Sequence, residues 1–535
     1  MFKWSLVPIT GLAVEHLILA TPTVSTMVIN VLAFLSFIIA FQAFSDYRRR
    51  RGIPYPPGPR PLPIIGNIFD IPKENSWLAY TKFSKEYGNI LSFHIFGRVI
   101  VVLNTVKATK DLLEKHGDIY SDRPVIPFYE MAGWQWALPM ARYSDPWRLG
   151  RKLLDRGLRA GVAVAYRPMQ QAKARLLLTR LLATPHEWEA HIELMQGELI
   201  LAMAYGYEPR GRDDRKIDVS RRVAKMGSET ALPSDLLVNG LPFLRHIPEW
   251  LSWFSYKPLA RIGHDLGMEM MNEPIRFVRE SMVNGTARPS LALENLQESE
   301  KLDGPEREKA EKVITETLAS IFAAGADTTV SAMMSFILAV LLRPDLQKKA
   351  QEELDAVTGR ERLPTFDDRQ RLPLIDAMCK EVTRWMPVTP LGLPHASTED
   401  NVYEGFFIPK GALVIGNTWA ILHDSATYPE PNIFKPERFL KSDGSSRDDP
   451  TLTSAFGFGK RICPGRHFAE ATLFIVIASM LSVFNIEKRP GSDGGLPFSY
   501  SYTGSILSRP NSFPCSITPR DKLADELVTE DEDGP

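Results

Sequence analysis

Residues 456–465 constrain this chain more than any other stretch, and they read Phe-Gly-Phe-Gly-Lys-Arg-Ile-Cys-Pro-Gly. Glycines at 459 and 465 flank Cys463 where close backbone approach or a positive φ is wanted, and Pro464 stiffens the exit. An isolated cysteine beside a glycine loop is ordinarily a buried free thiol. The spacing Phe-x-x-Gly-x-Arg-x-Cys-x-Gly, however, arises by chance in about one such chain in ten thousand. The stretch therefore predicts a cysteine with a chemical task, followed by a helix over 466–481.

This stretch resembles the haem-binding signature of the haem-thiolate monooxygenases, the cytochrome P-450 family, and it fills every fixed position of that signature. The resemblance implies that Cys463 is the axial ligand of the iron of haem b. It also implies that Phe456 and Arg461 lie at the cofactor, with Arg461 pairing with a propionate. A thiolate ligand pushes electron density onto haem iron and favours O–O cleavage, and hydrogen bonds from backbone N–H groups to the sulfur tune the iron.

A long, largely apolar run over 314–342 predicts a buried helix through the centre of the domain. Residues 324–329 read Ala-Gly-Ala-Asp-Thr-Thr, which a helix tolerates badly because glycine costs about 1 kcal/mol relative to alanine and a buried aspartate needs partners. Without the cysteine pattern, a kinked core helix with capped polar groups would be the favoured interpretation. The segment resembles the family's oxygen-activation motif. That likeness implies that Gly325 makes room for a flat ring and dioxygen, and that Asp327 and Thr328 supply protons.

Two further sites belong to the predicted haem environment. Trp147 and Arg151 are spaced i,i+4 on a helical stretch, a spacing that alone favours a surface stacking pair. With the cysteine signature present, the pair resembles the family's helix whose Trp and Arg contact a haem propionate. His395 follows Leu393 and Pro394 at a position where the family often has a basic propionate partner, although a lone histidine is usually structural.

Glu381 and Arg384, spaced i,i+3, precede Arg438 by about fifty residues. This order resembles the family's buried Glu–Arg pair and the arginine that joins it, which implies a structural role for all three beneath the haem. Between them, residues 402–409 and 412–415 are predicted to be strands of a small sheet.

The predicted fold class is mainly α with small β-sheets, in a single haem-thiolate monooxygenase domain behind an N-terminal transmembrane helix. The motifs run from Trp147 to Cys463 and, by the resemblance, meet at one cofactor, so we expect one domain over 64–519. Residues 45–63 form a basic and proline-rich linker, and residues 520–535 are polar and acidic, which predicts a disordered tail.

Residues 24–44 are apolar enough, and at roughly 31 Å as a helix long enough, to cross a bilayer core. We expect a single-pass anchor after a short lumenal segment over 1–23; a cleaved signal peptide is the alternative. Four arginines at 48–51 favour a cytosolic domain. The resemblance to microsomal members of the family implies that the membrane is that of the endoplasmic reticulum.

Composition and missing motifs indicate which partners the protein needs. A formal net charge of −1 gives no reason to expect nucleic acid, and three cysteines leave no disulfide framework. The sequence has no Gly-x-Gly-x-x-Gly after a strand and no Walker-type loop. Electrons from NADPH must therefore arrive through a separate reductase. Arg148, Lys152 and Arg156, spaced i,i+4,i+8, predict a positive docking stripe for it.

The predicted reaction inserts one oxygen atom of O2 into a lipophilic small molecule. The likeness is greatest to fungal microsomal members that oxidise natural products, and a terpenoid is the preferred substrate. An aromatic polyketide or indole hydroxylase is the first alternative. A reductase-independent haem-thiolate isomerase or dehydratase is the second, although it would need no Asp327–Thr328 relay; a non-catalytic haem or sterol-binding protein is a third. Aromatic residues over 241–256 suggest a bilayer contact or ordinary core.

Overall fold

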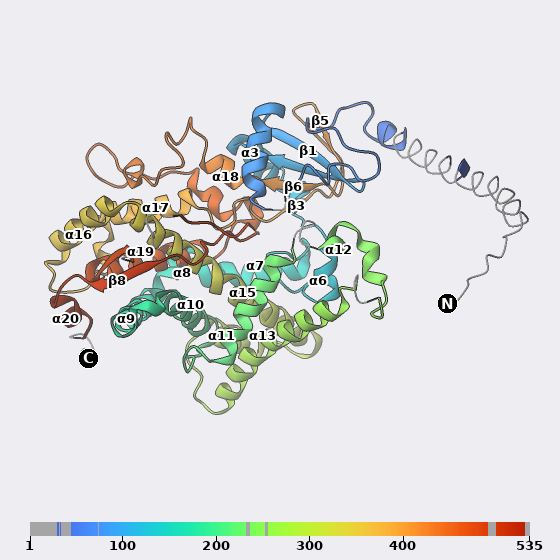
Figure 1. The fold of residues 1–535 in the computed structure, drawn as a ribbon. Helices are drawn as coiled ribbons and strands as arrows, with labels where there is room; N and C mark the ends of the chain where they lie inside the picture. Colours follow the sequence, from blue (N-terminus) through green and yellow to red (C-terminus); the bar gives the residue numbers. More distant parts are fainter. Residues whose placement is uncertain are drawn as a thin grey trace, which may run out of the picture.

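Helix α15, Gly304–Leu342, is the central helix of the domain (Figure 1). Residues from Val313 to Leu341 are mostly buried, and the helix ends before Pro344. The predicted central helix is confirmed, but it begins ten residues earlier than 314, because the charged residues before Val313 form an exposed first part of the same helix. Both α15 and α19, Arg466–Val483, are long and apolar enough to cross a membrane, yet both are mostly buried inside the domain, so they are core helices.

The computed structural model describes residues 29–30, 33, 44–72, 74–231, 236–251, 255–489, 499–504 and 506–529. Most of the predicted anchor and all of the predicted lumenal segment lie outside these residues. Within them helices dominate and the strands form small sheets, as the predicted fold class requires. The longer helices are α3 Ser76–Tyr87, α7 Asp145–Leu158, α9 Arg167–Ala183, α10 Trp188–Tyr205, α11 Arg215–Glu229, α13 Lys257–Val283, α14 Leu291–Ser299, α16 Pro344–Thr358 and α17 Pro373–Trp385. The shorter ones are α4 Val106–Thr109, α5 Gly117–Tyr120, α6 Pro127–Met131, α8 Ala160–Ala163, α12 Leu237–Gly240, α18 Thr418–Leu422 and α20 Leu523–Thr529.

The largest sheet has the strand order β1-β2-β6-β3. Its strands are β1 Ile90–Ile95, β2 Arg98–Leu103, β6 Leu413–Gly416 and β3 His395–Ala396; β2 and β6 pair in parallel, and the other two pairings are antiparallel. Two-stranded pairs join β4 Asn401–Tyr403 to β5 Phe406–Ile408, and β7 Phe484–Lys488 to β8 Cys515–Pro519. The strands expected over 402–415 are therefore confirmed, but they belong to two sheets rather than one.

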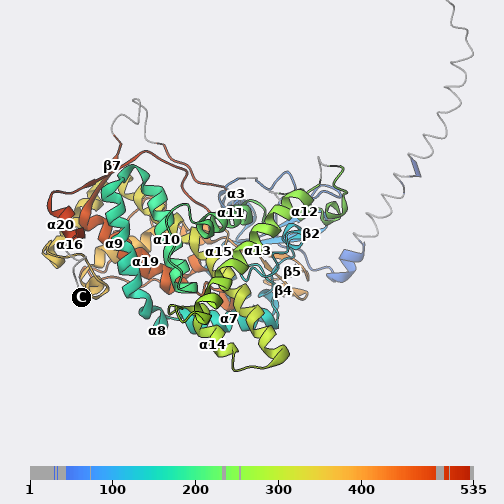
Figure 2. The same cartoon turned by 90° about the horizontal axis from the view of Figure 1, so that it is seen from below.

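Two large apolar clusters form the core, and α15 contributes to both. Its first half packs with α7, α10 and α13, and its second half packs with α17 and α19 (Figure 2). The segment Ala324–Thr329 falls between the two apolar halves, where α15 contributes no fully buried apolar side chain. The fold therefore brings the polar segment of α15 to the junction of the two clusters.

The predicted disordered tail is wrong for its first part. Helix α20 covers Leu523–Thr529, and Ala524, Leu527 and Val528 are buried in the same cluster as α19. These three residues lie at i, i+3 and i+4, so they form one apolar helix face although the average composition of the segment is polar. Residues 530–535 lie outside the described part of the chain.

Candidate active site

The loop that carries Cys463 is folded tightly before α19. Gly459 has φ 53°, and a Cβ there would lie 2.3 Å from the Leu113 carbonyl oxygen. The Cys463 N–H donates to the Phe456 carbonyl at 2.7 Å, which closes the loop. The glycine at 459 is therefore required by both its backbone angle and its close contact, as the sequence predicted.

Two opposing effects act on the thiol of Cys463. Burial raises its pKa, whereas a hydrogen bond from the Gly465 backbone N–H and the nearby cations of Arg151 and Arg466 lower it. Burial is the larger effect, so the pKa of the free Cys463 thiol is raised, and the Gly465 N–H and the two arginines limit that rise. Binding to a metal, which takes the thiolate, would draw the proton off.

Cys463 lines a cavity of about 440 Å³ that α15 also lines, at Ala324, Gly325, Thr328 and Thr329. The remaining lining is mostly apolar. It comes chiefly from Tyr129, Trp134, Trp136, Met386, Val388, Leu391, Leu393, Ile506 and Leu507. Of the residues predicted to form the site, Trp147, Arg151, Gly325, Thr328, His395, Phe456, Arg461 and Cys463 all line this cavity, and Asp327 does not. The fold thus gathers nearly the whole predicted set from four segments of the chain.

Two buried arginines lie at the edge of this cavity. Arg461 donates to the carbonyls of Ser121 and Ala141 at 2.7 and 2.9 Å, and its Nη1 has no hydrogen-bond partner among the described residues. Arg123 donates to the carbonyls of Pro139, Leu393 and Pro394 at 2.6–2.8 Å. Only 8% of Arg461 and 3% of Arg123 is exposed. Guanidinium groups this deeply buried and bonded to carbonyls favour an anion beside them.

The donor set of the cavity fits a haem. Cys463 offers a soft sulfur ligand, and Arg123 and Arg461 supply the two positive charges that a pair of propionates would balance. Arg123 was missed in the sequence, where no spacing rule distinguishes it; only its tertiary contacts reveal it.

Trp147 and Arg151 occupy the inner face of α7, as predicted, but their observed contacts differ from each other. The Trp147 ring lies 4.1 Å from the guanidinium carbon of Arg461, a cation–π contact. Arg151 donates to the Ile462 carbonyl at 2.6 Å, next to Cys463. Helix α7 therefore contacts both Arg461, the predicted propionate partner, and the loop that carries Cys463.

His395 is fully buried beside the same arginines. Its Nδ1 lies 2.7 Å from the Tyr120 carbonyl, which can only accept, so this nitrogen carries the proton. Burial and the cations of Arg123 and Arg461 hold the pKa of His395 well below its usual range. A haem propionate beside His395 would oppose the lowering of its pKa by the two arginine cations. The predicted role of His395 as a propionate partner therefore requires the propionate to be bound.

Gly325 has a packing role that the sequence did not indicate. A Cβ on Gly325 would lie 2.7 Å from Cδ1 of Ile200 on α10. Gln196, one turn before Ile200, donates to the Gly325 carbonyl at 2.8 Å. The glycine lines the cavity as expected, but the space left by its missing side chain is taken by α10.

The two predicted proton-handling residues face different surroundings. The Thr328 hydroxyl donates to the Ala324 carbonyl at 2.9 Å within α15 and lies at the cavity. Asp327 instead pairs with Arg509 at 3.2 Å. Burial raises the pKa of Asp327, the Arg509 cation opposes that rise, and Glu193 adds to it.

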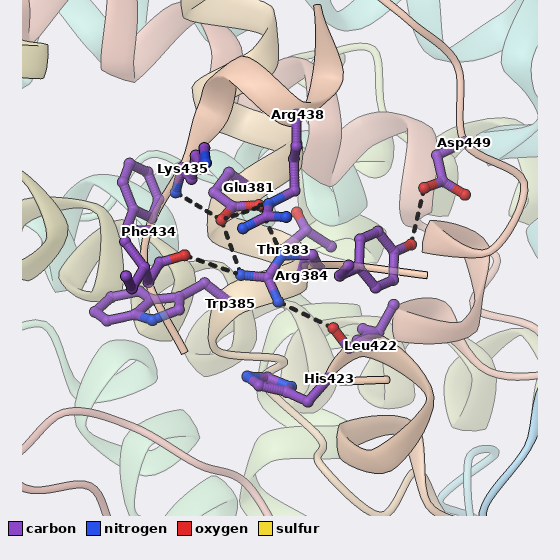
Figure 3. Close-up of polar contacts among 12 residues, drawn as sticks. Glu381, Thr383, Arg384, Trp385, Leu422, His423, Phe434, Lys435, Arg438 and Asp449 are labelled. Carbon is purple, nitrogen blue, oxygen red and sulfur yellow. Dashed lines mark hydrogen bonds and ion pairs between the residues drawn. The ribbon is translucent and has the colours of Figure 1, made fainter. Parts of the chain in front are cut away.

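Glu381, Arg384 and Arg438 form the predicted buried cluster (Figure 3). Arg384 donates to both carboxylate oxygens of Glu381 at 2.7 and 2.8 Å, and Arg438 lies 3.2 Å from the same carboxylate. Glu381 and Arg384 are fully buried. Arg384 also donates to the Leu422 carbonyl, so the cluster joins α17 to α18 and to the turn that holds Arg438. Its contacts are those of a structural cluster, since none of the three lines the cavity.

Comparison with known proteins places the chain in a family. Residues 56–513 match the family model described as cytochrome P-450. The chain is 40% identical to cytochrome P-450 monooxygenase 208 of Postia placenta over 501 residues, which is 93% of this chain and 96% of the relative. It is 39% identical to cytochrome P-450 monooxygenase claR of Ampulloclitocybe clavipes over 96% of this chain and 94% of the relative. A third relative, the cytochrome P-450 monooxygenase eriA of Hericium erinaceus, is 39% identical over 92% of this chain and 93% of its own length.

These relatives are fungal proteins and span nearly the whole chain, and the family model covers the cavity and its cysteine loop. The chain therefore belongs to the cytochrome P-450 family and is a monooxygenase, an oxidoreductase whose cofactor is a haem with a cysteine thiolate ligand.

Proposed function

We propose that this monooxygenase inserts one oxygen atom of O2 into a lipophilic natural product, with a terpenoid as the preferred class, at the cytosolic face of the endoplasmic reticulum. The other oxygen atom leaves as water. The observation that carries the proposal is the cavity, whose wall is largely apolar and whose polar lining includes Thr328 and Thr329 on α15 and the arginines near Cys463. An apolar wall favours binding of a lipophilic molecule without hydrogen-bonding groups.

The residues of the chain divide into binding, orienting and proton-handling groups. When bound, the haem supplies the activation of dioxygen, which a thiolate ligand promotes. Cys463 would hold its iron, and Arg123, Arg461 and His395 would hold its propionates. The Thr328 hydroxyl donates to the Ala324 carbonyl, and its oxygen could accept a hydrogen bond from a proton donor at the cavity. Asp327, one residue before it, would supply protons to this part of α15.

We further propose that electrons arrive from an NADPH-dependent reductase, since members of the family generally require a redox partner. Anchoring by residues 24–44 is supported by exposed apolar residues at one end of the domain. Phe69, Phe243 and Trp250 are 81%, 63% and 79% exposed. In both views, α12 and the β1–β2 hairpin lie at the end of the domain opposite α16 and α20 (Figures 1 and 2).

The test is turnover by membranes that contain the protein, a reductase and NADPH, with separate panels of terpenes, aromatic polyketides and indoles. We expect products heavier by one oxygen atom from the terpene panel, and label from ¹⁸O2 in those products. Oxidation confined to the polyketide or indole panel would show that the substrate is not a terpenoid, and the proposed monooxygenase reaction would stand. Conversion of a peroxide without reductase, with no oxidation in any panel, would instead support an isomerase or dehydratase.

A further inference from the structure

Asp327 is held away from the cavity by a residue from a distant part of the chain. Nη1 of Arg509 lies 3.2 Å from Oδ1 of Asp327, and Nη2 of Arg509 lies 2.5 Å from Oε1 of Glu193 on α10. All three side chains are about three-quarters buried. Arg509 thus bridges two carboxylates, and only one of them is on α15.

The segment that carries Arg509 also forms part of the cavity wall. Ile506 and Leu507 line the cavity, three and two residues before Arg509. The next residue, Ser508, is fixed on both sides: its N–H donates to the Val388 carbonyl at 2.8 Å, and its carbonyl accepts from the Ser331 hydroxyl at 3.1 Å. The segment from Ile506 to Arg509 therefore connects the cavity wall to the Asp327–Arg509–Glu193 bridge within four residues.

Other charged groups near this bridge are few. Glu193 lies 3.9 Å from Arg221 on α11, and Glu189 lies close enough to act electrostatically on Arg509. Arg509 and Glu193 are the charged groups that shift the pKa of Asp327, Arg509 downward and Glu193 upward. Burial has the largest effect on the pKa of Asp327, and among charged groups Arg509 and then Glu193 act on it most.

We propose that Arg509 is a positioning residue that couples the cavity wall to the proton donor: it holds Asp327 against Glu193 and away from the cavity, and it is moved by contacts at Ile506 and Leu507. This inference rests on the proton-handling role proposed for Asp327. In this arrangement an occupied cavity shifts Arg509 toward Glu193. The carboxyl of Asp327 is then freed to turn toward Thr328 and to take up a proton.

The test measures the protonation of Asp327 without substrate or reductase. In the haem-loaded protein, reduced under carbon monoxide, the C–O stretching band is followed by infrared spectroscopy as a function of pH, because the band responds to charge near the cavity. Arg509→Met removes the cation beside Asp327, so the pH at the midpoint of the change in the C–O band should rise by about one unit. Glu193→Gln removes the neighbouring anion, so the midpoint should fall. Asp327→Asn should abolish the titration.

Two matched variants separate positioning from general support. Arg509→Lys keeps the charge and should keep the midpoint near that of the parent. Arg520→Met removes a similar arginine, paired with Asp355 at 2.6 Å and far from the cavity, and should lower stability without moving the midpoint. Leu507→Phe, which enlarges the wall residue, should shift the midpoint in the parent but not in Arg509→Met.

Opposite shifts in Arg509→Met and Glu193→Gln show that the bridge sets the charge around Asp327, and a Leu507→Phe shift that is lost in Arg509→Met is the result that a merely structural bridge does not give. An unshifted midpoint in Leu507→Phe would overturn the coupling. A parent band that does not titrate, a titration that survives in Asp327→Asn, or an equal midpoint in Arg509→Met and the parent would each overturn the inference. Because the band is measured without turnover, the result stands apart from whether any terpene is oxidised.

Discussion

At the residue scale, Cys463 shows how much the local backbone contributes to one ligand. Burial alone raises the pKa of a thiol, and the Gly465 N–H and two arginines act in the opposite direction. Metal binding favours the deprotonated form further, since only the thiolate is a good ligand. The pKa of the free Cys463 thiol is nevertheless raised, so the loop limits the effect of burial and the metal itself would favour the thiolate.

Replacing Cys463 by Ser exchanges a soft thiolate for a hard hydroxyl. Haem bound to Cys463→Ser, reduced under carbon monoxide, should lack the long-wavelength absorption of thiolate-ligated haem. Cys379→Ser is the matched control, because Cys379 is buried in the core and does not line the cavity. An unchanged spectrum in Cys463→Ser would show that another residue is the ligand.

Of the two predicted proton-handling residues, Asp327 and Thr328, only Thr328 lines the cavity, and Thr328→Ala removes its hydroxyl. Alanine keeps the helix, so NADPH should still be consumed while product per NADPH falls about tenfold or more, as expected for loss of a positioned proton-transfer group. Thr328→Ser, which keeps the hydroxyl, should stay near the parent ratio. If NADPH use and product fall together in Thr328→Ala, the hydroxyl has no part in proton delivery.

Single residues were predictable where chemistry fixes their spacing. Cys463, Arg461, Glu381 and Arg384 lie in short patterns, and the structure places them in the cavity or in the buried cluster. Arg123 donates hydrogen bonds to backbone carbonyls, and Arg509 to carboxylates, of residues that are far away in sequence. No local pattern marks such residues, because their partners become neighbours only after folding.

At the scale of elements, α10 and α15 approach each other at Gly325. Gly325→Ala would bring a methyl group within 2.7 Å of Cδ1 of Ile200, so we expect a loss of about 1–3 kcal/mol in the free energy of unfolding. Ile200→Val removes that Cδ1 and should restore most of the loss in the double variant. Chemical denaturation of the four proteins measures this coupling. Additive effects would mean that the two helices do not meet at this point.

Helix α7 separates a cofactor face from a solvent face. Trp147 and Arg151 line the cavity, whereas Arg148, Lys152 and Arg156 are exposed. Reversing Arg148 and Lys152 to Glu should raise the reductase concentration needed for half-maximal turnover several-fold and weaken its salt dependence, because exposed charges steer partners and salt screens them.

The control for this reversal is Lys348→Glu on α16, an exposed lysine that does not line the cavity. It should leave reductase dependence unchanged, and both proteins should keep the spectral shift that a bound substrate induces. If the α7 variant shows the parent's turnover and salt dependence, the reductase docks on another surface.

Sheet pairing was the least predictable feature of the elements. The periodicity over 402–415 identifies strands, but β6 pairs with β2 from about three hundred residues earlier, and β4 pairs with β5. Strand partners depend on the path of the whole chain, which local alternation does not encode. The long helices, by contrast, carry their own pattern in consecutive residues, and α15 and α19 were predicted apart from their ends.

At the scale of the whole molecule, the N-terminal linker, the β1–β2 hairpin and α12 all lie toward the same end of the domain (Figure 1). Exposed apolar side chains occur in the linker and shortly after it, at Leu62, Ile64 and Phe69, and in α12 and the residues after it, at Leu237, Phe243, Trp250 and Leu251. Solvent-exposed apolar patches on this scale mark interaction surfaces, and their place beside the linker after the predicted anchor favours a bilayer. Trp253 and Phe254, which belong to the same predicted aromatic stretch, lie outside the described residues.

A protein that lacks residues 1–50 should therefore still associate with membranes, because this apolar end remains. Phe243→Asp with Trp250→Asp, added to the truncation, should release it into the soluble fraction, since each charge opposes burial in the bilayer interface. Val283→Asp is the matched control: Val283 is 88% exposed but lies at the end of α13, and its replacement should not change the distribution. Sedimentation with lipid vesicles measures the bound fraction. A truncated protein that is already fully soluble would mean that the anchor alone holds the domain at the membrane, and that Phe243 and Trp250 face water.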